Sequence, residues 1–222
     1  MIKPVISASI MCADFLHLAK DIQMLEECGI ELLHFDIMDG VFVPNLMLNN
    51  ELMKCIRTVT RIPFDVHLMI INPEDKIKWF SLAPQDIVSV HYESTPHIQR
   101  AIYEVKNAGA RVAIAINPAT PVEAIKNFLP DIDMALIMTV NPGYAGQQLI
   151  VQCLDKIKET RQLLDDAGYE NIRVQADGNC SFENCILMRA AGADCFVAGT
   201  SSLFSKDMQK SDAIRKLREA IQ

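Results

Sequence analysis

Histidine and aspartate side chains alternate with apolar ones in short β-like segments of this chain. His34 and Asp36 lie two positions apart, and His67 and Asp177 lie in two later segments of the same kind. Side chains two positions apart on an extended strand point to the same face. Burying such polar groups costs free energy unless they pair with something. We therefore treat these four residues as one candidate site.

The donor atoms of the four residues suit a divalent metal. Two imidazoles and two carboxylates are typical of zinc sites, and the same set admits manganese, iron or cobalt. A carbon next to a carbonyl can lose its proton if a Lewis acid stabilises the resulting charge, and Asp36 and Asp177 could then exchange protons on its two faces. Each of these residues taken singly is more often a helix cap or a core residue. The prediction of one metal ion per chain and two catalytic aspartates therefore depends on their combination.

Other residues near the predicted strand ends have supporting interpretations. Asp39 precedes Gly40 and is predicted to be a turn residue. Asp65 shares a face with His67 but lies deeper in the strand, where we expect it to support the site structurally. Methionines in strands usually fill the core. Four of them could instead line the site, namely Met11, Met38, Met69 and Met138.

Stepwise alternation of apolar strands and amphipathic helices predicts the fold. Amphipathic segments such as 14–28 and 147–167 lie between short, nearly continuous apolar runs of the kind found in buried parallel strands. Eight strand–helix repeats predict a single (β/α)₈ TIM barrel over residues 1–222, with its chemistry at the carboxyl ends of the strands. A doubly wound open sheet would usually carry a dinucleotide fingerprint, which is absent. The predicted strands are 4–9, 31–37, 63–69, 86–91, 111–116, 133–140, 171–176 and 194–198.

One helix start carries a cap signal. Thr120, Pro121 and Glu123 have the spacing of an N-cap, a first-turn proline and a capping-box glutamate. We therefore expect an α-helix to begin at this position.

Glycine-rich turns follow the last three predicted strands and contain no lysine or arginine. Such turns allow backbone N–H groups to approach an anion closely, and this fold often binds phosphate there. One such turn is a weak signal, whereas three in a row indicate a phosphate site. The turns comprise Asn141 to Gln147, with Gly143, Tyr144, Ala145 and Gly146; Asp177, Gly178 and Asn179; and Gly199, Thr200 and Ser201.

Composition excludes several partners. The net charge is −7, which argues against nucleic acid because a phosphate backbone requires a basic face. No apolar run is long enough to span a membrane and no signal peptide is recognisable. The seven cysteines contain no Cys-x-x-Cys pair, so we expect reduced thiols in a cytoplasmic protein.

Several segments together resemble the ribulose-phosphate 3-epimerase family over nearly the whole chain. The family fold is a (β/α)₈ barrel, in agreement with the strand count. The matching segments are Ser7 to Phe15, His34 to Asn45, Asp65 to Met69, Met138 to Gln147, Asp177-Gly178, and Gly192 to Gly199.

The resemblance implies a role for each matched position. The activity would be reversible inversion at C3 of a ketose phosphate through an enediolate. Asp36 and Asp177 would be the acid and base, and both would join His34 and His67 as metal ligands. Ser9 and His67 would contact the substrate, as would turn residues, namely Gly143, Tyr144, Ala145, Gly146, Asp177, Gly178, Asn179, Gly199 and Thr200. The family also includes homo-oligomers, so this chain is compatible with one.

Departures from the usual family pattern concern the length of the sugar. Ala145, Asn179-Cys180 and Thr200-Ser201 resemble the D-allulose-6-phosphate 3-epimerase branch, as do Met11-Cys12. They favour interconversion of D-allulose 6-phosphate and D-fructose 6-phosphate, with D-ribulose 5-phosphate 3-epimerase as the alternative. A phosphate-binding-barrel decarboxylase is disfavoured because the segment around Asp36 lacks lysine. A silent barrel with a binding role would be expected to lose one of the four ligands.

Overall fold

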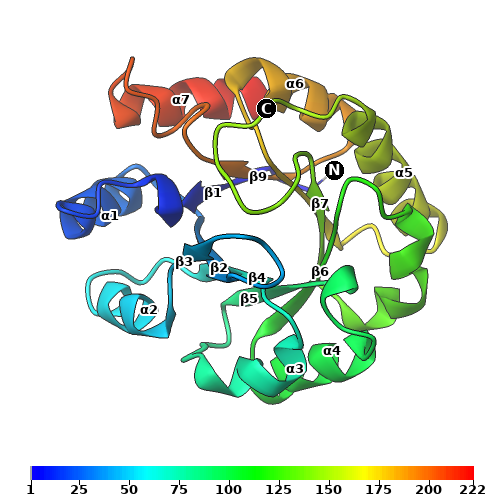
Figure 1. Cartoon of the computed structure of the whole chain (residues 1–222). Coiled ribbons are helices and arrows are strands. Elements are labelled where there is room, and N and C mark those ends of the chain that lie inside the picture. Colours follow the sequence, from blue (N-terminus) through cyan, green and yellow to red (C-terminus); the bar gives the residue numbers. More distant parts are fainter. Residues whose placement is uncertain (1) are drawn as a thin grey trace.

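The computed structural model describes residues 2–222, and eight parallel strands close into a barrel (Figure 1). The strands are β1 (Val5–Ser9), β2 (Leu32–Asp39), β3 (Leu46–Met47), β4 (Phe64–Met69), β5 (Ile87–His91), β6 (Arg111–Ile116), β7 (Met134–Met138), β8 (Arg173–Asp177) and β9 (Cys195–Ala198). Their order is β1-β9-β8-β7-β6-β5-β4-β2, and pairing between β1 and β2 completes the ring. The short β3 pairs with β2 in antiparallel orientation. The predicted (β/α)₈ fold is therefore confirmed.

Helices form an outer layer around the barrel (Figure 1). They are α1 (Leu18–Glu27), α2 (Asn50–Arg57), α3 (Pro73–Lys76), α4 (Ile98–Asn107), α5 (Gln152–Asp166), α6 (Phe182–Ala191) and α7 (Lys210–Ile221). Short 3₁₀ turns are η1 (Ile10–Cys12), η2 (Ile77–Trp79) and η3 (Tyr92–Ser94), while the longer η4 (Val122–Asp131) connects β6 to β7. None of the helices within residues 2–222 combines the length and apolarity that a membrane crossing demands.

The predicted capping box at Thr120 is wrong. The residue before η4 is Pro121, which has an extended backbone, and η4 is a 3₁₀ helix that includes Pro130. A proline inside a helix removes one hydrogen bond from the i→i−4 ladder, which disfavours a regular α-helix here. The hydroxyl of Thr120 donates to Glu93, whereas a capping hydroxyl would accept from a helix N–H group.

The barrel interior changes from apolar to polar toward the carboxyl ends of its strands. Leu32, Ile87, Met134 and Cys195 form one buried apolar cluster near the amino-terminal ends. Positions two and four residues after Leu32 on the same face of β2 are His34 and Asp36. The outward faces of the strands pack on the helices in the main hydrophobic core. The fold thus supports polar side chains on a rigid, apolar base.

Candidate active site and metal centre

Four side chains from β2, β4 and β8 meet in one cluster. Asp36 lies opposite His67 in the β2–β4 register, and His34 is two residues earlier on the same face. Asp177 is the last residue of β8, which is separated from β2 by β9 and β1. One ligand atom from each residue lies within 4.8 Å of the others. Barrel closure therefore brings together donors from distant parts of the sequence.

One ring nitrogen of each histidine, here called its inner nitrogen, faces the carboxylates of Asp36 and Asp177. His34 Nε2 lies 3.3 Å from Asp36 Oδ1 and 3.7 Å from Asp177 Oδ2. The corresponding distances from His67 Nδ1 are 3.3 and 3.4 Å. Within residues 2–222, His34 Nε2 is buried and finds no hydrogen-bond partner. A buried unpaired nitrogen is costly, and a divalent cation between these donors would satisfy it. The residues fit such an ion.

The outer nitrogen of His34 is held by a buried carboxylate. His34 Nδ1 lies 2.7 Å from Asp65 Oδ2, and Ser7 donates to the same oxygen at 2.7 Å. Gln175 also donates to it, from β8 across the barrel. Carboxylates of this kind orient metal-binding histidines and fix their tautomer. Asp65 thus has the supporting position expected from the sequence.

His67 has a different outer partner, which the sequence analysis did not single out. His67 Nε2 lies 2.8 Å from Nε2 of the buried His91, at the end of β5. His91 Nδ1 in turn lies 3.2 Å from Glu93 Oε2. The spacing His-x-Glu directly after an apolar strand was the available signal for this pair.

The buried ionisable groups at the site shift one another's pKa. Burial alone would raise the pKa of Asp36, but the adjacent His34 and His67 outweigh it and hold that pKa well below its usual range. Burial disfavours protonated His34, yet Asp65 and Asp36 raise its pKa well above the ordinary value. Burial lowers the pKa of His91 to about 4, so His91 is neutral at physiological pH. Asp36 is therefore ionised and attracts positive charge.

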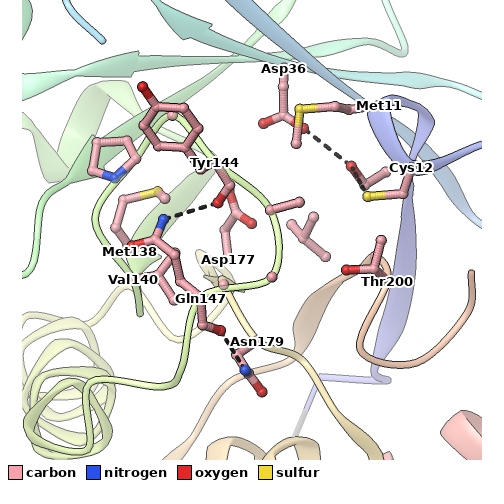
Figure 2. Close-up of a pocket in the computed structure, with 18 of the residues that line it drawn as sticks. Met11, Cys12, Asp36, Met138, Val140, Tyr144, Gln147, Asp177, Asn179 and Thr200 are labelled. Atoms are coloured by element: carbon pink, nitrogen blue, oxygen red, sulfur yellow. Dashed lines mark hydrogen bonds between the residues drawn. The ribbon is translucent and has the colours of Figure 1, made fainter. Parts of the chain in front are cut away.

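A pocket opens above the cluster and contains most residues of the predicted substrate site. Figure 2 shows Asp36 and Asp177 in this pocket, with Met11 beside Asp36 and with Asn179 and Gln147 together on another side. His34 and His67 do not line it, because both are fully buried beneath. The lining includes Ser9, Met11, Asp36, Met38, Met69, Met138, Gly143, Tyr144, Ala145, Gly146, Asp177, Gly178, Asn179, Gly199 and Thr200. Asn141, Gln147 and Ser201 from the predicted turns also line it, together with Cys12, Val140 and Val197, which were not predicted.

Two turns around the pocket are connected to each other. Asn45 donates to the carbonyl of Gly143 at 2.9 Å, and the Tyr144 hydroxyl donates to the carbonyl of Pro44 at 2.9 Å. The turn after β2 is therefore tied to the turn after β7. No lysine or arginine lines the pocket, so anion binding there would depend on backbone amides and hydroxyls.

Asp39 is the last residue of β2 and organises the turn that follows. Its carboxylate accepts hydrogen bonds from the backbone N–H groups of Val41, Phe42 and Ile71, each at 2.9 Å. Lys76 donates to it at 3.1 Å. The predicted turn role of Asp39 is confirmed, although the strand reaches two residues further than the predicted end at residue 37.

Comparison with known proteins gives a consistent result. A model of the ribulose-phosphate 3 epimerase family matches residues 5–204. Ribulose-phosphate 3-epimerase from Bacillus subtilis is 40% identical over 213 residues, covering 96% of this chain and 97% of the relative. The enzyme of that name from Escherichia coli is 37% identical over 207 residues, covering 92% and 91%.

A solved structure with a different activity shares the fold. 3-Keto-L-gulonate-6-phosphate decarboxylase from Vibrio cholerae aligns with a TM-score of 0.72, covering 99% of this chain and 98% of that chain. Its sequence identity is only 13%, so the likeness concerns the barrel architecture alone.

Proposed function

The chain belongs to the ribulose-phosphate 3-epimerase family, and from this premise we propose that it interconverts D-ribulose 5-phosphate and D-xylulose 5-phosphate by inverting C3. It is accordingly an isomerase of the epimerase type. The observation that carries the proposal is the convergence of His34, Asp36, His67 and Asp177, with ligand atoms within 4.8 Å of one another. Such a cluster can supply a cation site and two carboxylates for proton transfer.

The four clustered residues are the proposed ligands of one divalent ion. Zinc suits two imidazoles and two carboxylates, and manganese, iron or cobalt would also be accepted. When bound, the ion supplies a Lewis acid for the negative charge that develops as C3 loses its proton. Asp65 and His91 would hold the two histidine ligands from behind.

The two aspartates are proposed to work on opposite faces of the substrate. Ionised Asp36 takes the C3 proton, and the electron pair of the C–H bond moves into the enediolate. Protonated Asp177 then returns a proton to the other face, which inverts the centre and leaves Asp177 ionised. The reverse reaction exchanges their roles. The low pKa of Asp36 at this site supports its starting state as the base.

The phosphate is proposed to bind in the turns after β7, β8 and β9. The candidate groups are backbone amides near Gly146, Asn179 and Thr200, with the Thr200 hydroxyl. An anchored phosphate would position C3 at a fixed distance from the cluster. Remote binding energy of this kind raises the rate because it orients the reacting carbon.

The choice between five- and six-carbon sugars follows from the relatives and from Asn179. The relatives are named for ribulose phosphate, which favours the shorter sugar. The six-carbon prediction relied partly on Asn179 as a hydrogen-bonding group for an extra hydroxyl. That side chain is already engaged, because it donates to the carbonyl of Gln147 and accepts from Asn184 at 2.8 Å. We therefore propose D-ribulose 5-phosphate as the main substrate.

Steady-state kinetics on both sugar phosphates test the proposal. We expect a higher kcat/KM for D-ribulose 5-phosphate than for D-allulose 6-phosphate, and incorporation of solvent deuterium at C3 during turnover. A clear preference for D-allulose 6-phosphate would transfer the same mechanism to the six-carbon substrate. Release of CO₂ without deuterium at C3 would instead support a decarboxylase.

The proposed location is the cytoplasm. All seven cysteines lie in the described residues as free thiols. Unpaired cysteines are typical of a reducing compartment, whereas disulfides persist in oxidising ones. Fractionation of cells that produce the protein would test this location.

A further inference from the structure

His91 connects a carboxylate to the candidate metal centre. Its Nε2 lies 2.8 Å from Nε2 of His67, and its Nδ1 lies 3.2 Å from Glu93 Oε2. The ring of Phe42 packs against it, with centroids 4.7 Å apart. His91 is fully buried, so these contacts define its surroundings. The connection runs from Glu93 through His91 to His67.

Donor and acceptor roles along this connection follow from its carboxylate end. Ionised Glu93 can only accept, so His91 Nδ1 must carry the hydrogen. A neutral imidazole has a single N–H group, which leaves His91 Nε2 as an acceptor. The hydrogen between the two rings must then belong to His67 Nε2. The lone pair of His67 is consequently on Nδ1, the atom that lies 3.3 Å from Asp36.

Glu93 is itself anchored by the segment after β6. Its Oε1 accepts from the backbone N–H of Asn117 at 2.8 Å and from the Thr120 hydroxyl. Lys156 fixes that segment by donating to the Asn117 carbonyl at 2.8 Å. Partial burial favours neutral Glu93, but hydrogen bonds from His91, Thr120 and Asn117 outweigh it and hold its pKa at about 2. Both carboxylate oxygens are therefore used as acceptors.

We infer that Glu93 and His91 are positioning residues that hold His67 in the tautomer with its Nδ1 lone pair toward the divalent cation. Neither residue lines the pocket above the cluster, so they act through His67 and not on the substrate. The inference rests on the proposed metal-dependent epimerase and adds two residues to it. It also explains why a third histidine is buried at the barrel mouth.

Replacing Glu93 by glutamine tests the donor roles. Glutamine has one acceptor oxygen, and Asn117 and Thr120 both require it at Oε1. The amide NH₂ then faces His91 Nδ1 and donates to it, which reverses the hydrogen between His91 and His67. We expect E93Q to bind zinc about 10–100-fold more weakly in competition with a chromophoric chelator. Unchanged zinc affinity in folded E93Q would overturn the inference.

A pair of His91 variants separates hydrogen bonding from packing. H91Q places an amide oxygen near the position of Nε2 and can still accept from His67, whereas H91F keeps an aromatic ring against Phe42. Our inference predicts tighter zinc binding by H91Q than by H91F. The opposite order would mean that His91 matters as an aromatic filler.

Two further measurements complete the test. The matched control is E74Q, because Glu74 is a buried glutamate that also accepts from a threonine hydroxyl, at 2.7 Å from Thr95. E74Q should keep the wild-type zinc affinity, and an equal loss would indicate general destabilisation. Nitrogen NMR of zinc-loaded wild type should show hydrogen on His91 Nδ1 and His67 Nε2, and hydrogen on His91 Nε2 would refute the assignment.

Failure of the inference and failure of the proposed function are distinguishable. Wild-type protein that binds zinc and epimerises, with variants that bind zinc equally well, would reject only the roles of Glu93 and His91. Wild-type protein that binds no divalent ion would reject both.

Discussion

At the scale of the residue, the two aspartates are alike in type but differ in surroundings. Asp36 lies inside β2, accepts from Ser9 at 3.2 Å and has a side chain that is 7% exposed. Asp177 ends β8 and is 14% exposed. The more accessible Asp177 can exchange its proton with water more readily, while Asp36 is shielded among the histidines. Their roles are chemically exchangeable, but their rates of proton exchange should differ.

We expect Asp177→Asn to lower kcat for epimerisation by about 10²–10⁴-fold, because asparagine cannot transfer a proton. One epimer should still exchange its C3 hydrogen with solvent, since a single face needs only one base. Product formation and deuterium exchange, measured separately with zinc present, check this expectation. Asp155→Asn on exposed α5 is the control. Near wild-type epimerisation by Asp177→Asn with metal bound would contradict the two-base mechanism.

At the scale of the element, the turn after β8 depends on a glycine. Gly178 has φ +122°, and a Cβ there would lie 2.6 Å from a methyl carbon of Val140. The Thr139 hydroxyl also donates to the Gly178 carbonyl at 2.5 Å. The turn is therefore packed tightly between β7 and β8, next to Asp177, the proposed proton donor.

Gly178→Ala should destabilise the protein by about 1–3 kcal/mol and raise KM, because overpacking adds to backbone strain. Gly109→Ala is the matched control: Gly109 has φ +82°, but a Cβ there meets no atom within 4 Å. Gly109→Ala should lose only the stability that backbone strain costs, and its KM should be unchanged. Denaturant unfolding measures the stability and steady-state kinetics measure KM. Equal effects at the two positions would show that contact with Val140 adds nothing to the backbone strain.

The turn after β2 should make the stability of the fold depend on pH. Partial burial would raise the pKa of Asp39, but hydrogen bonds from Phe42, Ile71 and Val41 outweigh it and lower the pKa to about 2 from an ordinary 3.8. A depressed pKa stabilises the fold above pH 4, and this stabilisation is lost as the pH falls toward 2. We compare the free energies of unfolding of wild type and Asp39→Asn. Wild type should be the more stable, and its advantage should be about 2 kcal/mol larger at pH 5 than at pH 2. Urea unfolding of both proteins between these pH values measures it, and a constant difference would be contrary to this account.

Prediction from the sequence succeeded where a pattern is local. Alternating polar residues at 34 and 36 and the apolar runs were enough to locate all eight barrel strands and the four residues that cluster as the candidate metal site. The strand predicted for 133–140 begins at Met134 and ends earlier than expected, at Met138. His91 was not predicted as part of the site because its contact with His67 depends on side-chain directions across two paired strands. Such contacts require the register and cannot be read from spacing.

At the scale of the whole molecule, an acidic chain is proposed to bind an anionic substrate. The net charge is −7, yet the pocket has no lysine or arginine. Long-range electrostatic attraction by the chain itself therefore cannot steer a sugar phosphate into the pocket. The affinity must come from short-range contacts with the bound substrate. The proposed cation adds positive charge at the barrel mouth, where the carboxylates are gathered.

Removal of the metal should therefore affect both activity and stability. Chelation should abolish epimerisation, and zinc, manganese or cobalt should restore it. At a free metal concentration of about 100 times Kd, binding stabilises the fold by about 2.7 kcal/mol. For a chain of this size the melting temperature should rise by roughly 5–10 °C. Calorimetry of chelated and reloaded protein checks this, and full activity of rigorously metal-free protein would exclude the metal.

All four proposed ligands are carried by strands, whereas much of the rest of the pocket lining comes from turns. Mutations in the turns can change which sugar fits while the reacting groups stay in place. A duplicated gene of this kind could therefore acquire a longer or shorter substrate in small steps, and each intermediate would remain an active epimerase. Because the reacting groups lie on strands, the catalytic step can stay the same while selection acting on the turns changes the substrate.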